Sequence, residues 1–569
     1  MKLKFNTKIA VIVLIFLGLA VYANTLRNGM FWDDNDFILN NAYVQSFSFV
    51  KFFSENLIAG AGFVSNYWRP VLLTVFSLEW HLFHNFAAGY HFVNMATHIA
   101  DGILLFYILL RSFGRRGLAF AAAAIFLVHP LATEAVSYAN SLGDSLSVFF
   151  MFSGILLFQK GQRAWPALFY VLALMSKETA IIMPGLLFLV AFFSPSSGDE
   201  EGARPNLALQ IKFALIKIWP YLLIAGAYVL LRATTLNFQN SFNLYNEENF
   251  FTQNIWIRIL TFFRILVVYF GLMFWPADLH MERGVQIATS FRRFDVMLGA
   301  VIFLSLLACA LLSFKKFPVI SFGLFWFLIG IAPTSNIAVP INGLLYEHWL
   351  YLPLIGIFLA AAYAVIFLVS KYSKLKIPAV ILFGVAIAGF AGRAIVRNTD
   401  WHDPIRFYNK TLAYSPDSTR VWNNLGMSYA DASDVAAAER AYKQALTFDP
   451  KLAPAIYNLG NLYRDQGRTA EAISQFQKTL ESDPHFYPAY RALLNVYLRE
   501  KKYPEVRELV ERELQGEASD VLTYVSLWQV AKLQGDYPGA LQYLDRALAL
   551  DPNYPGLHEA YLETKSKVK

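Results

Sequence analysis

Long apolar stretches recur through the first 400 residues, and they constrain the fold more than any other feature of this sequence. Each approaches the length of about 18 to 20 residues that an α-helix needs to cross a bilayer. A single stretch of this kind would also suit a buried helix of a soluble protein, but so many in one chain predict a polytopic membrane protein. The stretches are 9–26, 90–110, 117–134, 141–159, 165–176, 179–193, 218–235, 255–276, 295–314, 318–335, 350–370 and 377–396.

The density of charged residues changes near residue 400. Residues 1–400 contain 28 Lys and Arg and 19 Asp and Glu, whereas residues 401–569 contain 20 and 22. The charged share rises from about 12% to about 25%, which is typical of soluble domains. The net charge of +7 comes from the apolar part, which excludes a basic nucleic-acid-binding domain and fits the Lys/Arg bias that orients membrane helices. We therefore expect a membrane domain at 1–398, a linker at 399–418 and a polar domain at 419–569.

Positive residues predict which loops face the cytoplasm. We interpret the first stretch as a retained helix, the alternative being a cleaved signal peptide. Three apolar runs lie between Lys217 and Lys316, where an even number of crossings is needed, so 255–276 is expected to be re-entrant, broken or on the surface. About eleven spans then remain in an inner (plasma) membrane, with residue 398 onward on the extracytoplasmic or periplasmic side. The positive residues are Lys2, Lys4, Lys8, Arg111, Arg115, Arg116, Lys160, Arg163, Arg204, Lys212, Lys217, Lys315, Lys316, Lys371, Lys374 and Lys376.

Residues 419 to 554 contain an internal repeat with a period of 34 residues. Small residues, tyrosines and prolines fall in register, as in the paired helices of tetratricopeptide repeats. The units start at 419, 453, 487 and 521, and the third unit lacks the glycine and the final proline. Such repeats stack into an α-solenoid that commonly grips an extended partner segment; the alternative is a helical cap that only supports the membrane domain. Aligned residues include Gly426 and Gly460; Tyr429, Tyr463 and Tyr497; Ala438, Ala472 and Ala540; Pro450, Pro484 and Pro552.

Ionisable residues that interrupt the apolar pattern gather on the predicted outer side. Charges at membrane depth are costly, so each is a functional candidate. Snorkelling anchors would be mostly Lys and Arg on both faces, whereas this set is rich in carboxylates and histidines. The pattern predicts a shared outward-facing active site, the alternative being a structural ion-pair network or an ion pathway. The candidates are the aromatic neighbour Trp32 and the ionisable residues Asp33, Asp34, Asp36, Arg69, His91, His129, Glu134, Asp144, Lys177, Glu178, Glu347 and His348.

The adjacent carboxylates Asp33 and Asp34 are chemically suggestive. Repulsion or burial can raise the pKa of one of them until it accepts a proton from a hydroxyl. Alternatively, the carboxylates could hold a divalent cation that clamps a phosphate-bearing donor. Residues His81, His84, His91 and His98 lack the spacing of a zinc site. A nucleotide-powered pump is not indicated because no Gly-rich phosphate loop occurs.

Several motifs in a fixed order resemble those of a known family. They read Asp33-Asp34, Arg69-Pro70, His129-Pro130 with Glu134 and Asp144, Lys177-Glu178-Thr179, Glu347 with Tyr351 and Pro353, and Arg397-Asn398 with Trp401, followed by the repeats. This series resembles the transmembrane and tetratricopeptide-repeat-containing O-mannosyltransferases and their prokaryotic relatives, which are GT-C glycosyltransferases. The resemblance covers nearly the whole chain.

The resemblance implies an inverting transfer from a polyprenyl-phosphate sugar donor to an acceptor hydroxyl on the outer side. Asp33 would be the general base, Asp34 would orient it or the acceptor, and Arg69 or Lys177 would offset the charge of the departing phosphate. Trp32, Asp36 and His91 are expected near the acceptor, and His129, Glu134, Asp144, Glu178, Glu347 and His348 near the donor. Leu142 and His348 stand where the family commonly has arginine, so mannose is not inferred.

The predicted fold is therefore all-α: a GT-C-type bundle of about eleven spans followed by a tetratricopeptide-repeat solenoid. The expected partners are the lipid-linked donor, an acceptor protein or glycan held by the repeats, and membrane lipid, without nucleic acid. No cofactor is assigned, and a divalent cation stays an open alternative. The rival function is a lipid-linked-saccharide transporter or a non-catalytic scaffold.

Overall fold

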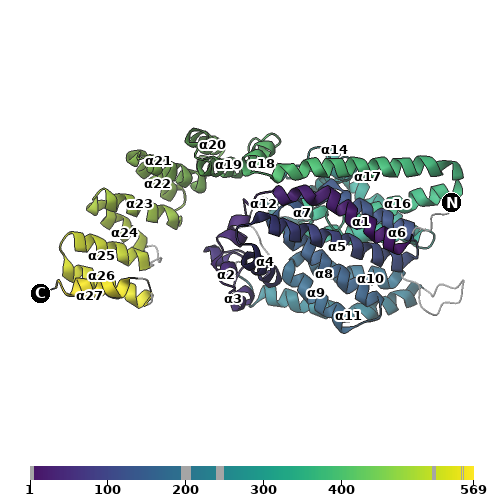
Figure 1. Cartoon of the computed structure of the whole chain (residues 1–569), viewed down its shortest axis with the longest axis horizontal. Coiled ribbons are helices and arrows are strands. Elements are labelled where there is room, and N and C mark those ends of the chain that lie inside the picture. The colour runs from purple at the N-terminus through teal and green to yellow at the C-terminus, as the bar shows by residue number, and fades with distance from the viewer. Residues whose placement is uncertain are drawn as a thin grey trace. The chain divides into compact units, whose positions relative to one another are not determined.

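The computed structural model describes residues 6–193, 207–238, 249–341, 343–515, 521–552, 554 and 556–568. Every regular element within these ranges is a helix, which confirms the all-α prediction. The chain divides into two compact units, Met1–Ser415 and Pro416–Lys569 (Figure 1). Lys2, Lys4 and Arg204, three of the positive residues used to predict the topology, lie outside the described residues.

The first unit is a bundle of apolar helices. Eight of the described helices are long and apolar enough to cross a membrane. They expose apolar side chains over much of their surface, as expected for helices that face lipid. These helices are α1 (Thr7–Tyr22), α5 (Ala87–Phe113), α8 (Leu142–Gln159), α11 (Leu207–Ala233), α13 (Ile255–Phe274), α14 (Phe294–Ser313), α16 (Leu354–Lys371) and α17 (Lys376–Asn398).

Other apolar segments in the described ranges are shorter or bent. The helix α6 (Arg116–Val128) and the segment Pro130–Ser137 together are apolar enough to count as a ninth span, but they are bent by 54°. The remaining apolar helices are α4 (Pro70–Phe83), α9 (Ala164–Ser176), α10 (Met183–Phe193) and α15 (Pro318–Ile331). A total of about eleven spans requires some of these shorter helices to cross. The helix α13 is unbroken over 20 residues, so the structure does not show the break that was one alternative for 255–276. A re-entrant or surface position of this segment stays a prediction.

Prolines at two helix starts place site residues at the ends of the bundle. In the Arg69-Pro70 motif, the proline occupies the first turn of α4, where its missing N–H costs nothing. Arg69 is therefore the N-cap residue of α4. The His129-Pro130 motif ends α6, because proline cannot continue a helix, and the His129 ring accepts a hydrogen bond from the Leu131 N–H at 3.2 Å. The proline of each motif thus has a structural role: Pro70 begins α4 and Pro130 ends α6.

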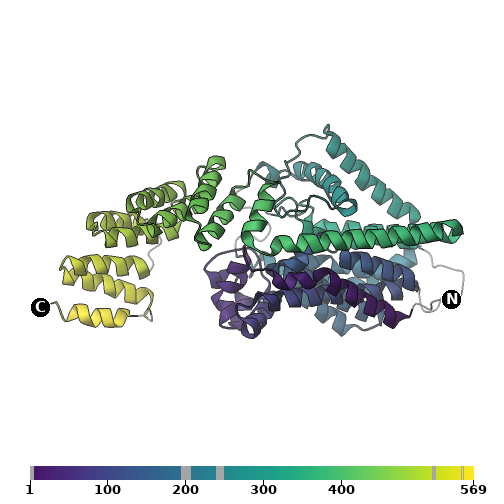
Figure 2. The ribbon, with the colours of Figure 1, turned by 45° about the horizontal axis from the view of Figure 1, so that its top comes forward.

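Short elements gather at one end of the bundle, where α1 ends and α5 and α8 begin. Figure 2 shows this end covered by the segment that follows α1. The short elements include α2 (Ala42–Gln45), α3 (Phe49–Ser54), α7 (Thr133–Ser137), α12 (Phe250–Gln253), and the turns η4 (Pro130–Ala132), η6 (Glu178–Ile182) and η8 (Glu347–Leu350). A single π-helical turn, η2 (Asn35–Leu39), follows Asp34.

The segment 399–412, expected as part of a linker, packs within the first unit. It forms η10 (Thr399–Trp401) and α18 (Pro404–Leu412). Trp401 and Phe407 are each 1% exposed, and both rings contact the ring of Phe31, at centroid distances of 6.0 and 5.3 Å. The boundary between the compact units falls between residues 415 and 416, inside the expected linker of 399–418.

The second unit is a solenoid of helix pairs that begin at the four expected unit starts. A Cβ at Gly426 would lie 2.5 Å from the Tyr442 ring, and one at Gly460 would lie 2.7 Å from the Phe476 ring, so glycine lets the two helices of a pair approach. The helices are α19 (Thr419–Asp431), α20 (Val435–Phe448), α21 (Ala453–Asp465), α22 (Thr469–Ser482), α23 (Tyr487–Arg499), α24 (Tyr503–Gln515), α25 (Val521–Leu533), α26 (Tyr537–Leu550) and α27 (Leu557–Lys565).

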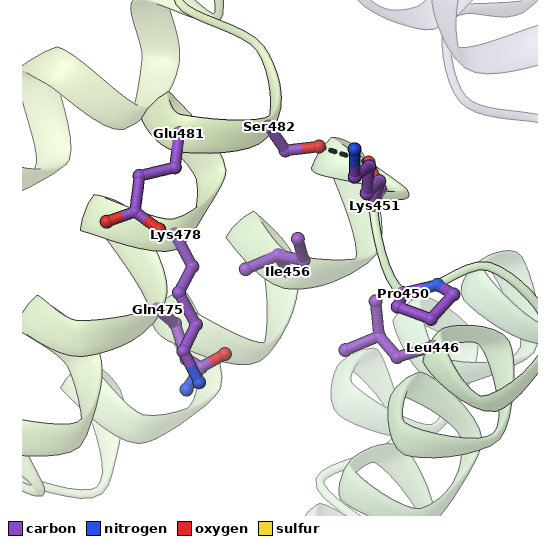
Figure 3. A pocket seen from close by; sticks show the side chains of 8 residues that line it. All are labelled: Leu446, Pro450, Lys451, Ile456, Gln475, Lys478, Glu481 and Ser482. Atoms are coloured by element: carbon purple, nitrogen blue, oxygen red, sulfur yellow. Dashed lines mark hydrogen bonds between the residues drawn. The ribbon is translucent and has the colours of Figure 1, made fainter.

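A surface cavity of about 300 Å³ lies between the first two helix pairs of the solenoid. Figure 3 shows Ile456 in the middle of the lining, Leu446 and Pro450 on one side, and Lys478 and Glu481 on the other. The Ser482 hydroxyl donates a hydrogen bond to the Lys451 carbonyl across its edge. The cavity thus arises where consecutive repeats meet.

Candidate functional site

The acidic doublet lies on a tight turn after α1 and η1 (Ala23–Arg27). Trp32 has a φ of 62°, in the left-handed region. Asp34 is 1% exposed, and its carboxylate accepts hydrogen bonds from the Phe31 N–H at 3.0 Å and the Asn140 N–H at 2.8 Å. Burial, with a smaller contribution from the Asp33 charge, raises the pKa of Asp34 despite these hydrogen bonds. Asp34 therefore shapes the turn that presents the half-buried Asp33.

Tyr138 fixes the backbone of Asp33. It was not among the residues predicted from the sequence. The Asp33 N–H donates to the Tyr138 hydroxyl at 2.9 Å, and the Tyr138 ring stacks on Trp401 at 5.0 Å. Burial, followed by the charges of Asp33 and Asp34, raises the pKa of Tyr138, so this hydroxyl stays protonated. Its position just after the Glu134 segment was the only signal in the sequence.

The three residues expected near the acceptor have different surroundings. Trp32 is 9% exposed and packs against Phe407 and Tyr408. His91 is fully buried, and its Nε2 donates to the Gly29 carbonyl at 3.2 Å. Asp36 is half-buried on η2, and burial raises its pKa. Trp32 and His91 thus support the acidic turn, and Asp36 alone of the three keeps a partly exposed side chain.

Two ion pairs lie where α4, α8 and η6 meet. Arg69 makes a two-pronged pair with Glu178, with N···O distances of 3.0 and 2.6 Å. Lys177 pairs with Asp144, in the first turn of α8, at 2.6 Å. Burial raises the pKa of Tyr67 to about 12; the charge of Glu178, and to a smaller extent Tyr346 and Asp33, acts in the same direction, and the charge of Arg69 opposes it. The Tyr67 hydroxyl therefore lies within electrostatic range of both the ion pairs and the acidic turn.

A further pair joins Glu134 of α7 to His348 of η8. The His348 Nδ1 lies 2.6 Å from the Glu134 Oε1, and the His348 N–H donates to the other carboxylate oxygen at 3.1 Å. Glu134 is fully buried. Tyr346 stacks on the His348 ring at 5.5 Å, and Tyr346 is also one of the groups that act on Tyr67. Tyr346 thus stacks beside the Glu134–His348 pair and lies within electrostatic range of Tyr67.

Glu347 lies among cations and is 1% exposed. Arg397 and Arg283 each approach it with an N···O distance of 3.7 Å, and the His280 N–H donates to it at 2.7 Å. Burial raises the pKa of Glu347, and the charge of Arg397 opposes this shift. Arg397 also pairs with Asp400 at 2.9 Å. The loop residues Arg283 and His280 carried no motif that sequence reasoning could have used.

His129 stands apart from these clusters. It is fully buried; its Nδ1 accepts from the Leu131 N–H and its Nε2 donates to the Met273 carbonyl at 2.9 Å. Both ring nitrogens are therefore occupied by the backbone, and the structure gives His129 a role in the chain reversal after α6 rather than a free side chain in the site.

The carboxylates of the site do not form a metal cage in the part of the chain that the structure describes. No group of three or more His, Cys, Asp or Glu there is arranged to hold a metal ion. Asp144, Glu178 and Glu134 each pair with a Lys, Arg or His side chain instead. A half-buried carboxylate beside several paired cations can take a proton from a hydroxyl and accommodate an anionic group nearby.

Comparisons with known proteins identify relatives of the chain. Family models for the tetratricopeptide repeat match residues 429–497 and 391–453. The chain is 28% identical to the protein O-mannosyl-transferase Tmtc1 of Drosophila melanogaster over 48% of its own length and 34% of that protein. It is 23% identical to the protein O-mannosyl-transferase F38B6.6 of Caenorhabditis elegans, over 75% and 61%. The chain thus spans between a third and two thirds of the length of these two relatives.

Several solved structures of tetratricopeptide-repeat proteins are similar to part of the chain. They include YrrB, a tetratricopeptide-repeat protein with an unusual peptide-binding site, at 18% identity and a TM-score of 0.25, over 28% of this chain and 82% of that one. MamA matches at 22% identity and a TM-score of 0.25, over 28% and 94%. The sequence relatives carry more information, and they confirm the resemblance that the motifs predicted. The chain is a homologue of the transmembrane and tetratricopeptide-repeat-containing protein O-mannosyl-transferases.

Proposed function

We propose that this chain is a membrane glycosyltransferase that moves a sugar from a polyprenyl-phosphate donor to an acceptor hydroxyl, with protein Ser or Thr as the preferred acceptor. The observation that carries the proposal is the set of Arg69–Glu178, Lys177–Asp144 and Glu134–His348 pairs in the segments between the apolar helices, together with an acidic turn whose Asp33 acts on the same Tyr67 hydroxyl as Arg69 and Glu178. A lipid-linked donor reaches such a site from the bilayer. The Lys/Arg bias of the other loops supports an extracytoplasmic position for this end.

Asp33 is the general base of the proposed reaction. The acceptor hydroxyl transfers its proton to the Asp33 carboxylate while its oxygen bonds to the anomeric carbon. The bond from that carbon to the phosphate oxygen breaks, and the lipid phosphate leaves with the electron pair. A single displacement of this kind inverts the anomeric centre. Asp34 is the weaker candidate for the base because it already accepts two backbone hydrogen bonds.

The donor phosphate belongs beside Arg69 and Lys177 in this proposal. Both cations are paired in the structure, Arg69 with Glu178 and Lys177 with Asp144. The carboxylates therefore hold the two cations in place, and the cations can share their N–H donors with an arriving phosphate. Such preorganised cations stabilise negative charge as it develops on a leaving group. The repeats are proposed to hold the acceptor, which is the common use of their scaffold.

The test is transfer of sugar by the purified full chain from polyprenyl-phosphate donors to Ser- and Thr-containing peptides. Asp33→Asn keeps the shape of the side chain and removes the base, so we expect the rate to fall by at least about a hundredfold. Glu55→Gln is the matched control, because Glu55 pairs only with Lys51 on the surface of α3 in the same outer segment. An active Asp33→Asn enzyme would remove Asp33 as the base. No transfer by the unaltered chain with any donor would remove the function.

A further inference from the structure

Three polar side chains form a buried network inside the bundle, below the site. His98 and Asp101 lie three residues apart on α5 and are fully buried, and Tyr351, which follows η8, is 2% exposed. The rings of Tyr22 and Phe126 pack against His98 at 5.0 and 5.1 Å. Polar groups at this depth are costly unless they are paired. None of these residues is used in the proposed transfer.

The hydrogen bonds join the three residues in a row. The His98 Nδ1 lies 2.7 Å from the Tyr351 hydroxyl, and that hydroxyl donates to the Asp101 Oδ2 at 2.8 Å. The other ring nitrogen, Nε2, lies 3.2 Å from the Leu127 carbonyl. A carbonyl only accepts, so Nε2 carries a proton. With the hydroxyl proton directed to Asp101, Nδ1 donates to the Tyr351 oxygen, so His98 is charged and Asp101 is ionised. With the opposite order of protons, Asp101 donates to the hydroxyl, the hydroxyl donates to Nδ1, and both groups are neutral. In both states the network has no net charge.

The Leu127 carbonyl needs this partner because α6 ends there. In a continuing helix the N–H four residues later, that of Leu131, would bond to it. Here the chain turns at Pro130, and the Leu131 N–H donates to the His129 ring instead. His98 therefore satisfies a carbonyl at the C-terminal end of α6, where a donor is also favoured by the helix dipole.

The network is connected to both partners of the Glu134–His348 pair. Through His98 it binds the carbonyl of Leu127, seven residues before Glu134. It also includes Tyr351, three residues after His348. The elements that carry Glu134 and His348 are thus joined by hydrogen bonds to the same turn of α5. A shift of either element would alter the 2.6 Å contact between these side chains.

We propose that His98, Asp101 and Tyr351 are positioning residues that set the geometry of the Glu134–His348 pair and of the adjacent Glu347. The structural part of this inference stands on the hydrogen bonds above. Its consequence for donor binding rests on the proposed function and on the place near the donor that the family resemblance implies for Glu134, Glu347 and His348. Loosening the network then weakens donor binding without removing a group that touches the reacting atoms.

Two readouts on the full chain in detergent test the proposal. Tyr351→Phe removes only the hydroxyl that joins His98 to Asp101. Tyr363→Phe is the matched control, because Tyr363 is also buried but lies on α16, about three helical turns beyond Tyr351 and against Arg115. The first readout is the rate at which diethylpyrocarbonate modifies His348, measured by peptide mass spectrometry, with the exposed His84 as internal standard. The second is KM for the polyprenyl-phosphate sugar.

We expect Tyr351→Phe to raise the modification rate of His348 several-fold and to raise the donor KM by about tenfold with a smaller change in kcat, since small misplacements of binding groups have effects of this size. Tyr363→Phe should change neither. Asp101→Asn also disrupts the His98–Tyr351–Asp101 network and should reproduce both effects. It replaces Tyr351→Phe in the test if that variant folds poorly.

Unchanged His348 reactivity in both Tyr351→Phe and Asp101→Asn would overturn the proposal, because the reactivity reports the pair directly and needs no enzymatic activity. If the unaltered chain transfers no sugar, the proposed function fails, while the modification readout still decides the positioning role. A third outcome is an active enzyme in which His348 reacts faster but the KM for the donor is unchanged. That result would confirm that the network positions the Glu134–His348 pair, and it would overturn the proposed effect on donor binding.

Discussion

The turn at Asp33 holds its shape against an unfavourable backbone conformation. The φ of 62° at Trp32 places a large side chain in the left-handed region, which costs on the order of 1 to 3 kcal/mol. Two interactions offset this cost: the hydrogen bonds that Asp34 accepts, and the packing of the Trp32 ring against Tyr408 at 5.4 Å. Asp34 is thus as important to the turn as Asp33 is to the proposed chemistry.

Asp34→Asn should destabilise the chain. The new amide keeps one acceptor oxygen but turns an NH₂ group toward one of the two N–H donors, so we expect a loss of about 1 to 3 kcal/mol. Differential scanning fluorimetry of the purified chain would show a lower unfolding midpoint. Glu55→Gln, which changes only a surface pair, should leave the midpoint unchanged, and an equal drop in both variants would contradict this role of Asp34.

The raised pKa of Asp34 also predicts how stability depends on pH. Burial raises this pKa above the ordinary value of 3.8, so between these two values the folded chain keeps a proton that the unfolded chain has lost. The stability of the unaltered chain should therefore decrease as the pH rises through this window. The difference in unfolding midpoint between the unaltered chain and Asp34→Asn, followed upward from about pH 4, should shrink. A difference that grows with pH would show that Asp34 is ionised throughout.

At the scale of elements, sequence periodicity predicted the helices but not their neighbours. Each apolar run became a helix because length and hydropathy decide whether a segment can be a buried or lipid-facing helix. The pairing of Lys177 with Asp144 and of Glu134 with His348 depends on which helices pack side by side, and no local pattern encodes that. Asp101, a carboxylate inside an apolar run, was a signal that sequence analysis passed over.

The Arg397-Asn398 motif shows how one side chain can join three elements. The Asn398 amide donates to the Val21 carbonyl and to the Asn24 side chain, at 2.7 and 2.9 Å, and its oxygen accepts from the Ser137 hydroxyl at 3.0 Å. Asn398 is fully buried. It thus fastens the end of α17 to the end of α1 and to α7, the two elements beside the acidic turn.

Asn398→Ala should lower stability by more than the loss of any one bond. Three buried hydrogen bonds disappear and their partners stay buried, so a loss of about 2 to 4 kcal/mol is expected. Ser137→Ala removes one of the three and should cost about 1 kcal/mol. Thermal unfolding of both variants and of the double variant checks this, because the double variant should be no less stable than Asn398→Ala alone. Simple addition of the two losses would show that the residues act separately.

At the scale of the whole molecule, the third repeat shows how a unit survives the loss of its glycine. Leu494 occupies the register position of Gly426 and Gly460. The position that faces these glycines holds Tyr442 and Phe476 in the first two pairs, and one period later it holds the smaller Val510. The side-chain volume has moved from one helix of the pair to the other, which a search for the glycine alone could not detect.

The division of the chain at residue 415 leads to a prediction about truncation. A chain that ends at 415 keeps Trp401, Phe407 and Tyr408, whose rings cover Phe31 and Trp32. A chain that ends at 398, the boundary expected from charge density, loses them. Each buried aromatic side chain contributes about 2 to 3 kcal/mol, so the shorter chain should be several kcal/mol less stable.

Circular dichroism and thermal unfolding of the two chains in the same detergent provide the comparison. The chain that ends at 415 should retain the unfolding midpoint of the membrane unit in the full chain, because the unit boundary leaves its packing intact. The chain that ends at 398 should unfold at a lower temperature, and exposure of Phe31 and Trp32 should loosen the turn that carries Asp33. Equal midpoints for the two chains would mean that η10 and α18 add nothing to the unit, and that the boundary near 398 describes the molecule better.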